Sequence, residues 1–335
     1  MKKALIAMSG GVDSSVCAYL AQKAGYECIG ATMLLCTDGG QDVKDAKRIC
    51  ERLGIEHHVF DMRQDFRNIV MEDFVSRYEE GATPNPCIMC NRHFKFGRLM
   101  DMAKKLGCDT IVTGHYAISD GQGGLFKAKD IKKDQSYVLW SLSTDTLKSC
   151  FFPLGDLTKA QAREIAEREG LVTARKSDSQ DICFVPDGDY ASFIEKYRNK
   201  KYPEGNFLDT ESNVLGTHKG IINYTQGQRK GLGIAFGKPM YVVSKNPDTN
   251  EVVLGENDDL YTKEVFLKDF NLIYKDYKET KAKIRYNQTE QTCALIIEDG
   301  GRARLIFKEP QRASAKGQSA VVYDGERVVG GGIID

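Results

Sequence analysis

The first 120 residues alternate short β-rich runs with helical patterns, and this alternation restricts the fold more than any other feature. The β-rich runs are KALIAM, CIGATML and HHVFDM, and the helical patterns cover 14–24, 42–53 and about 65–80. A helix after each strand predicts a parallel sheet with helices on both of its faces. We therefore expect an α/β domain over residues 1–200.

The sequence changes in character after about residue 200. A glycine-rich stretch, TQGQRKGLGIAFG, is followed by YVVSKNPDTNEVVLG, which is typical of two strands around a Pro-Asp turn. From about residue 261 alternating strands and turn residues dominate. We expect a small central β-rich domain at 201–260 and a compact antiparallel β-barrel at 261–335.

Composition limits the compartment and the partners. Lysine plus arginine equals aspartate plus glutamate at 47 each, so any nucleic acid would bind through a local basic face and not through net charge. The N-terminal apolar run ends at Met8, so we expect no export signal, no membrane association and a cytoplasmic location. Ten cysteines in a reducing compartment indicate catalysis, metal binding or packing, and packing is expected for Cys17, Cys28, Cys50 and Cys293.

The segment MSGGVDSS at 8–15 follows the first predicted strand and opens the first helix. Gly10 and Gly11 let the backbone approach an anion, while serine hydroxyls and the helix N-terminus supply hydrogen-bond donors. Neither the Gly-Lys-Ser/Thr of a Walker loop nor the G-x-G-x-x-G of a dinucleotide fold is present. The segment therefore predicts a different kind of pyrophosphate-binding loop.

Two cysteines, Cys87 and Cys90, stand two residues apart in TPNPCIMCN, just ahead of a helical pattern. This spacing is used for zinc, for thiol–disulfide exchange, for iron–sulfur clusters and for persulfide chemistry. The residues alone do not choose among them.

The glycine–serine segment resembles the PP-loop of ATP pyrophosphatases, and eight segments in order look like tRNA-specific 2-thiouridylase. They are GATMLL at 30–35, TPNPCIMCN at 83–91, TGHYA at 113–117, KDQSYVL at 133–139, SDSQDICF at 177–184, TQGQRKGLG at 225–233, KIRYNQ at 283–288 and GQSAVVYDGERVVGGGII at 317–334. The match runs from residue 3 to the C-terminus. The resemblance implies an ATP-dependent tRNA-uridine 2-sulfurtransferase, which replaces the oxygen on carbon 2 of the wobble uridine by sulfur and forms AMP and pyrophosphate.

The resemblance also implies roles for individual residues. The expected ATP-binding residues are Met8, Ser9, Gly10, Gly11, Val12, Asp13, Ser14, Ser15, Met33 and Gly114, with Asp13 helping to place Mg²⁺. The target base is expected to meet Asn85, Pro86 and Cys87. The positions that match tRNA contacts are His115, Lys133, Asp134, Gln135, Arg285, Tyr286 and Gln318.

Two cysteines carry the expected sulfur chemistry. Cys90 matches the catalytic cysteine, and Cys183 matches the cysteine that receives sulfur as a persulfide. One thiol would deliver sulfur while the other reduces the persulfide, which releases sulfide or leaves a Cys90–Cys183 disulfide. The partners implied are the anticodon arm of tRNA and a sulfur donor such as a cysteine desulfurase or a relay protein.

The chain departs from the family where many members carry aspartate and this sequence has Cys87. Cys87, Cys90 and Cys183 make three thiols, the number that holds a 4Fe-4S cluster with one iron open. A cluster that carries the sulfur is therefore an alternative to the persulfide relay, and zinc with a histidine as fourth ligand is another.

Two other function classes fit parts of the sequence. A PP-loop ligase or amidase acting on a small metabolite would explain SGGVDSS, but it would explain neither Cys90 and Cys183 nor the barrel. An RNA-binding protein without catalysis would explain the barrel and not the loop. Detection of 2-thiouridine after incubation with ATP, sulfide and tRNA would distinguish the thiouridylase from these two function classes.

Overall fold

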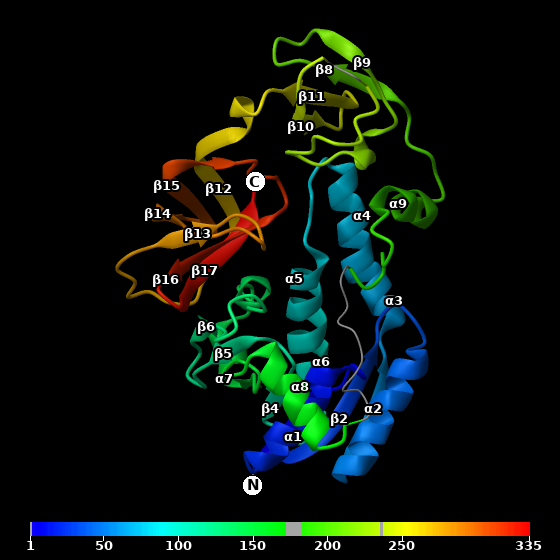
Figure 1. The fold of residues 1–335 in the computed structure, drawn as a ribbon, viewed down its shortest axis with the longest axis vertical. Coiled ribbons are helices and arrows are strands. Elements are labelled where there is room, and N and C mark those ends of the chain that lie inside the picture. The colour runs from blue at the N-terminus through cyan, green and yellow to red at the C-terminus, as the bar shows by residue number, and fades with distance from the viewer. Residues whose placement is uncertain (1, 172–181, 235–236) are drawn as a thin grey trace.

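The computed structural model describes residues 2–171, 182–234 and 237–335, so residues 177–181 of the SDSQDICF segment lie outside the described part. Figure 1 shows a sheet-and-helix unit that holds the N-terminus, a small β unit at the opposite end, and a barrel beside the long helices. Over the described ranges, no helix has the length and apolar character needed to cross a membrane.

The first unit is built on a five-stranded sheet in the order β3-β2-β1-β4-β7, in which every neighbouring pair is parallel. The strands are β1 (Lys3–Ala7), β2 (Glu27–Leu34), β3 (Glu56–Asp61), β4 (Thr110–Val112) and β7 (Cys150–Phe151). Because the chain passes from β1 to β2 and β3 on one side and then to β4 on the other, the topology reverses between β1 and β4. The predicted parallel sheet is confirmed.

Helices cover both faces of this sheet, as the alternation predicts. One face carries α1 (Val12–Lys23), α2 (Gly40–Leu53) and α8 (Lys159–Arg168), and its core joins Ile6, Val16, Ile49 and Ala162. The other face packs against α6 (Leu99–Lys105). Local signals set the helix ends, since Gly54 caps α2 in the left-handed region and Thr158 with Gln161 forms a capping box at the start of α8.

Two long helical rods rise from the sheet toward the small β unit (Figure 1). The first joins α3 (Arg63–Phe66), a π-helical segment (Arg67–Met71) and α4 (Glu72–Glu79), close to the helix predicted at about 65–80. The second joins α5 (Pro86–Cys90), a π-helical segment (Asn91–Arg98) and α6. Gly97 allows the second π segment, because a Cβ there would come within 2.9 Å of the Arg92 carbonyl oxygen.

The central unit is a four-stranded sheet, and α9 (Tyr190–Arg198), the helix before it, packs against it. Its strands are β8 (Gly205–Leu208), β9 (Val214–His218), β10 (Tyr241–Asn246) and β11 (Glu251–Gly255), in the sheet order β10-β11-β8-β9. Phe74 and Tyr78 of α4 share its hydrophobic core with Phe207. Arg198 of α9 adds ion pairs to Glu72 and Glu79, so the central unit is fastened to the first rod.

The C-terminal unit is the expected antiparallel β-barrel. Its strands are β12 (Tyr261–Leu272), β13 (Lys281–Lys283), β14 (Gln291–Glu298), β15 (Arg302–Arg312), β16 (Ser319–Asp324) and β17 (Arg327–Ile334). The barrel closes because β12 pairs with β15 on one side and with β17 on the other. Leu305, Phe307, Val322 and Val329 fill its interior. Closure removes the exposed edges that an open sheet would leave.

The barrel is joined to the α/β unit more closely than the sequence indicates. A hairpin of β5 (Ala117–Ser119) and β6 (Leu125–Lys127) extends the barrel sheet through the Arg327–Phe126 pair. Trp140 lies in the segment just before α7 (Thr144–Lys148), and its side chain is buried. Its indole nitrogen donates to Ser319 Oγ of the barrel at 3.0 Å. Trp140 and Val321 belong to one continuous core that spans both units.

Candidate active site

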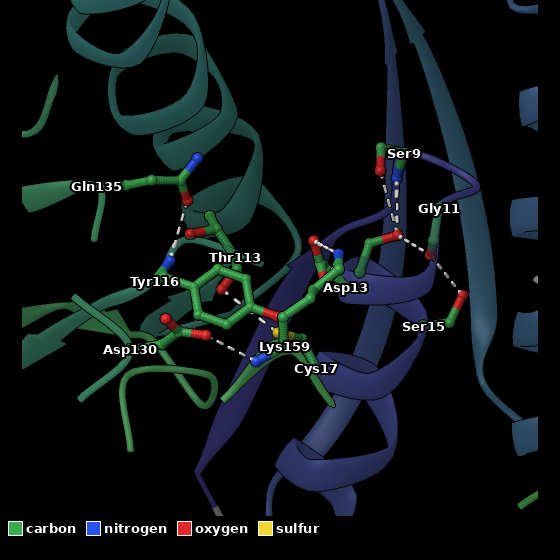
Figure 2. A network of polar contacts seen from close by, with 11 residues as sticks. Ser9, Gly11, Asp13, Ser15, Cys17, Thr113, Tyr116, Asp130, Gln135 and Lys159 are labelled. Carbon is green, nitrogen blue, oxygen red and sulfur yellow. Dashed lines mark hydrogen bonds and ion pairs between the residues drawn. The ribbon is translucent and has the colours of Figure 1, made fainter. Parts of the chain in front are cut away.

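The glycine–serine loop closes on itself through its own hydroxyl groups. The backbone nitrogen and the hydroxyl of Ser9 both donate to Ser14 Oγ at 3.2 Å, and Ser14 and Ser15 donate to the Gly11 carbonyl at 3.0 and 2.9 Å (Figure 2). Gly10 has a φ of +69°, and a Cβ there would lie 2.3 Å from the Asp42 carbonyl oxygen. Only glycine fits this position, so the loop geometry is built into the sequence.

Asp13 stands at the start of α1 and is held by two side chains from other elements. Lys159 Nζ lies 2.8 Å from both carboxylate oxygens, and the Tyr116 hydroxyl donates to Oδ1 at 3.0 Å (Figure 2). The lysine side chain is 12% exposed and the aspartate side chain 31%. Lys159 therefore places a second positive group, beside the helix N-terminus, at the loop.

The residues expected to bind ATP converge at one edge of the sheet. The loop follows β1, Met33 lies near the carboxyl end of β2, and Gly114 comes two residues after β4. Gly114 approaches the loop so closely that a Cβ would lie 3.0 Å from Asp13 Cβ. This edge, at the point where the strand order reverses, is where parallel α/β sheets bind their ligands.

The C-x-x-C pair lies at the start of the second rod. Asn85 caps α5, because its side-chain oxygen accepts from the Cys87 backbone nitrogen at 3.1 Å, and Pro86 occupies the first turn. Cys87 is exposed, whereas Cys90, one turn further on, is 9% exposed and packs with Phe66 and other apolar side chains. The two thiols face the same side of the helix with different access to solvent.

Two further cysteines meet beside this helix start. Cys36 lies two residues beyond the end of β2, and its Sγ is 3.7 Å from the carbonyl oxygen of Cys183, to which it donates. Phe184 packs edge-on against Phe66 and Phe74 and so fixes the Cys183 turn against the first rod. The sequence analysis did not single out Cys36. Its place just after a strand, at the edge that carries the glycine–serine loop, is the signal that could have found it.

Comparisons with known proteins match the whole chain. Family models described as tRNA methyl transferase HUP domain, tRNA methyl transferase PRC-barrel domain and Aminomethyltransferase beta-barrel domain match residues 2–187, 191–256 and 262–334. The curated tRNA-specific 2-thiouridylase MnmA of Clostridioides difficile (strain 630) is 46% identical over 354 residues, which cover 100% of this chain and 98% of that protein. The enzyme of the same name from Lachnoclostridium phytofermentans is 45% identical over 355 residues, covering 100% and 99%.

The chain belongs to the tRNA-specific 2-thiouridylase family. Among solved structures, a 4-thiouridine synthetase–RNA complex with bound ATP covers 59% of this chain and 50% of that chain, with 20% identity and a TM-score of 0.38. That structural likeness is too low to carry an argument, so the family assignment rests on the full-length sequence matches.

The neighbouring thiols of this 2-thiouridylase-family chain affect one another's pKa. Burial raises the pKa of Cys90 to about 11, and the nearby Cys87 and Cys36 oppose its ionisation further. The hydrogen bond with the Cys183 thiol lowers the pKa of Cys36 to about 7, and the same bond raises the pKa of Cys183. The Cys36 thiol therefore ionises closer to neutral pH than the buried Cys90 thiol does.

Three of these cysteines lie near one another. Cys87, Cys90 and Cys183 are close enough to affect one another's pKa. Within the described ranges, no group of three or more histidine, cysteine, aspartate or glutamate side chains is arranged to hold a metal ion. The cysteines predicted to serve packing, Cys17, Cys28, Cys50 and Cys293, are all buried.

The tRNA positions predicted in the α/β unit are partly buried. His115 is buried between Thr113, whose hydroxyl lies 2.7 Å from Nδ1, and Lys95, whose Nζ lies 3.4 Å from Nε2. Burial lowers the pKa of His115 well below its usual value, so the ring is neutral. Asp134 is buried and accepts hydrogen bonds from backbone nitrogens of its own loop, and Gln135 accepts from the Tyr116 nitrogen at 3.0 Å.

The tRNA positions predicted in the barrel meet those of the α/β unit. Tyr286 is exposed and donates to the Asp134 carbonyl at 3.0 Å, while Gln318 donates to the Thr83 carbonyl at 2.7 Å. Arg285 donates to the carbonyl oxygens of Gln226 and Ala313. A depression of about 440 Å³ opens where these segments join, and its lining includes Lys132, Lys281, Lys283 and Tyr286. The surface between barrel and α/β unit thus combines cations with an aromatic ring.

Proposed function

We propose that this chain catalyses ATP-dependent thiolation of carbon 2 of the wobble uridine in tRNA, as an enzyme of the cytoplasm. The observation that carries the proposal is that the glycine–serine loop and a group of thiols lie at the same edge of one sheet. A base bound at that edge would meet both an activating nucleotide and a sulfur nucleophile. Methyl transfer, the reaction named in the family-model descriptions, would use neither feature.

Activation of the base comes first in this proposal. A carbonyl oxygen is a poor leaving group, so attack of the oxygen on carbon 2 at the α-phosphate of ATP gives an adenylated base and pyrophosphate. Residues 8–15 would hold the phosphates through backbone nitrogens and hydroxyls, with Met33 and Gly114 completing the ATP site. Asp13 and Lys159 would place Mg²⁺ and phosphate oxygens, since both carry charge at the loop.

Sulfur transfer follows at the thiols. We propose that Cys183 receives sulfur as a persulfide from a cysteine desulfurase or a relay protein, because it is exposed on a turn that faces solvent. Asn85, Pro86 and Cys87 would line the position of the target base at the start of α5, with Cys90 beneath them. A 4Fe-4S cluster on Cys87, Cys90 and Cys183 is the competing proposal, since three thiols can hold such a cluster with one iron open.

The tRNA would lie across all three units, which we place at 1–200, 201–260 and 261–335. The barrel is held against the α/β unit by a shared core, so the two can grip the anticodon arm as one body. A base that is modified must leave its stack, and contacts on either side of the arm would hold the RNA while the base is turned out. The depression lined by Lys132, Lys283 and Tyr286 would contact the RNA, and Lys133, next to Lys132 in the sequence, would add a cation to the RNA backbone.

The test is a reconstituted reaction with bulk tRNA that lacks thiolation. The chain is incubated with ATP, Mg²⁺ and sodium sulfide, the tRNA is digested, and the nucleosides are analysed by mass spectrometry. We expect 2-thiouridine together with equal amounts of AMP and pyrophosphate. Formation of AMP on a small metabolite without tRNA, or binding of tRNA without turnover, would contradict the proposal and favour one of the two other function classes.

A further inference from the structure

Tyr116 connects two parts of the predicted site that lie far apart in the sequence. Its hydroxyl donates a hydrogen bond to Asp13 Oδ1 at 3.0 Å, at the start of α1. Its backbone nitrogen donates to Gln135 Oε1 at 3.0 Å (Figure 2), and its carbonyl oxygen accepts from the Gln135 backbone nitrogen at 2.7 Å. The residue is 3% exposed. One buried residue thus bridges a predicted tRNA position and a predicted ATP position.

The outer end of this bridge is Gln135, in a loop that the barrel also contacts. The preceding residue, Asp134, accepts hydrogen bonds from the backbone nitrogen and the hydroxyl of Ser136 at 3.2 and 2.8 Å, which fix the loop from within. Tyr286 of the barrel donates to the Asp134 carbonyl at 3.0 Å. The side-chain nitrogen of Gln135 points away from Tyr116 (Figure 2), and the structure gives it no hydrogen-bond partner among the described residues. Its two N–H groups are therefore donors for an RNA acceptor.

The inner end of the bridge is Asp13 in the glycine–serine loop. Two side chains hold its carboxylate from different elements: Tyr116 from the segment after β4, and Lys159 from α8, with Nζ 2.8 Å from both oxygens. The segment that carries Tyr116 packs tightly on the loop, because a Cβ at Gly114 would lie 3.0 Å from Asp13 Cβ and 3.4 Å from the Ser14 nitrogen. A shift of Tyr116 therefore moves the carboxylate, since close-packed atoms transmit a displacement.

We propose that Tyr116 is a positioning residue that couples tRNA binding at Gln135 to the Asp13 carboxylate of the ATP site. With tRNA bound, the carboxylate is held in one orientation and adenylation of the base is fast. Without tRNA, the bridge has no anchor at its outer end and ATP is turned over slowly. The inference rests on the proposed function, because it needs an ATP site at residues 8–15 and a tRNA contact at Gln135.

The coupling follows from the way in which the bridge is bonded. An RNA acceptor that binds the Gln135 amide nitrogen restricts rotation of that side chain and so fixes the oxygen that accepts from Tyr116. Because both backbone polar groups of Tyr116 are bonded to Gln135, its backbone follows the loop, and its hydroxyl holds Asp13 in place. ATP orders the same bonds from the other end. Ordering by one ligand lowers the entropic cost of ordering for the other, and the effect is reciprocal.

The first experiment measures the coupling by binding alone. The dissociation constant of unmodified tRNA is determined by filter binding for the full-length chain, with and without a saturating ATP analogue whose α,β-methylene bridge prevents pyrophosphate release. We expect the analogue to tighten tRNA binding about fivefold or more in the unaltered chain. In Y116F, which keeps the ring and loses only the hydroxyl, tRNA alone should bind with unchanged affinity and the analogue should have no effect. The same ratio in Y116F and the unaltered chain, or no tightening in either, overturns the inference.

Two further variants control this measurement. In Y202F a half-buried tyrosine hydroxyl that also donates to a carboxylate, that of Glu79, is lost in the central unit, so Y202F should keep the full effect of the analogue. Urea unfolding shows whether Y116F folds. If it does not, Q135A takes its place, because Gln135 is half-buried in a loop. Q135A should bind tRNA more weakly and lose the effect of the analogue, and an effect that persists in Q135A overturns the inference.

The second experiment is a double-mutant cycle on tRNA-dependent pyrophosphate release by Y116F, Q135A and the double variant. Y116F should lower kcat about tenfold with an unchanged KM for tRNA, as loss of one hydrogen bond to a charged group does. Because both residues act through one bridge, their effects on kcat should not add. Additive effects, or an unchanged kcat in Y116F, overturn the inference and leave the proposed function intact. If the unaltered chain forms no 2-thiouridine and releases no pyrophosphate with tRNA, the proposed function itself fails.

Discussion

Trp140 makes the junction between barrel and α/β unit directly measurable, because it is the one tryptophan in the sequence. Its ring is buried at that junction and lies against the backbone of Gly331 in β17. A Cβ added at Gly331 would come within 2.7 Å of the ring carbon Cγ and 2.8 Å of Cδ2. G331A is therefore a minimal change whose three nearest contacts all belong to Trp140 at the junction.

The cost can be worked from these distances. An ordinary contact begins at 3.4 Å, so the ring has to move by about 0.7 Å, a shift that disturbs its 3.0 Å hydrogen bond to Ser319 Oγ. Overpacking of this kind costs about 1–3 kcal/mol, with about 1 kcal/mol more if the Ser319 bond is lost. With an m-value of about 3 kcal/mol/M in urea, the midpoint of unfolding should fall by roughly 0.3–1.3 M.

Urea unfolding followed by tryptophan emission is the assay. G331A should lower the midpoint, change the emission of the native protein and reduce tRNA thiolation, because the barrel no longer docks in register. G325A serves as the control: the position has open space around it but a φ of +57°, so it costs backbone strain without touching Trp140. Equal midpoints and equal native emission for G331A and the unaltered chain would refute the account of the junction.

Three further outcomes are expected. D13N should lower tRNA-dependent pyrophosphate release about 100-fold, because it removes a charged group at the phosphate site. The control D145N removes a surface ion pair, 2.8 Å long, with Lys148 and should leave pyrophosphate release unchanged. The alkylation rate of Cys36 by iodoacetamide should rise through about pH 7, because its folded pKa is lowered, while that of Cys90 should rise only near pH 11; identical profiles would contradict the assigned hydrogen bond. C87A should keep substantial activity with a persulfide donor under the relay, and complete loss of activity would favour the cluster.

Local sequence signals predicted most of the fold. Strand–helix alternation predicted the parallel sheet, and the alternating strands after residue 261 predicted the barrel. Gly54 at the end of α2 and the Thr158–Gln161 box at the start of α8 are signals of the same local kind, because caps depend on neighbours in the chain. Such signals act over a few residues, so they can be found without knowledge of the tertiary structure.

Contacts between distant residues could not be predicted in the same way. Trp140 and Ser319 are 179 residues apart in the sequence. The pattern of strands in the sequence also does not indicate that β6 extends the barrel sheet by pairing with β17. The shared core also means that truncation after residue 260 would expose Trp140 and Tyr137 to water. Point substitutions at the junction are the better test of the barrel's role.

The candidate site also combines residues that local sequence signals identify with contacts that only the fold creates. Cys87 and Cys90 are recognisable from their spacing on one helix, whereas Cys36 and Cys183 are 147 residues apart and are brought together only by the fold. His115 matches a tRNA position by sequence but is buried in this conformation, so its contact with RNA stays a prediction that requires movement of its surroundings. Sequence reveals which residues carry chemistry, and the fold decides which of them act together.

The common edge of the sheet also restricts the order of events at the site. The ATP loop follows β1, and Cys36, whose sulfur lies 3.7 Å from the Cys183 carbonyl oxygen, follows β2, so the loop and the thiols lie at the ends of adjacent parallel strands. A base held at the start of α5 could then be adenylated and thiolated without changing place. HS⁻ released from a Cys183 persulfide would arise beside the base, and its concentration there would exceed that in solution. Excess free sulfide should therefore replace the persulfide donor, whereas dilute sulfide should not.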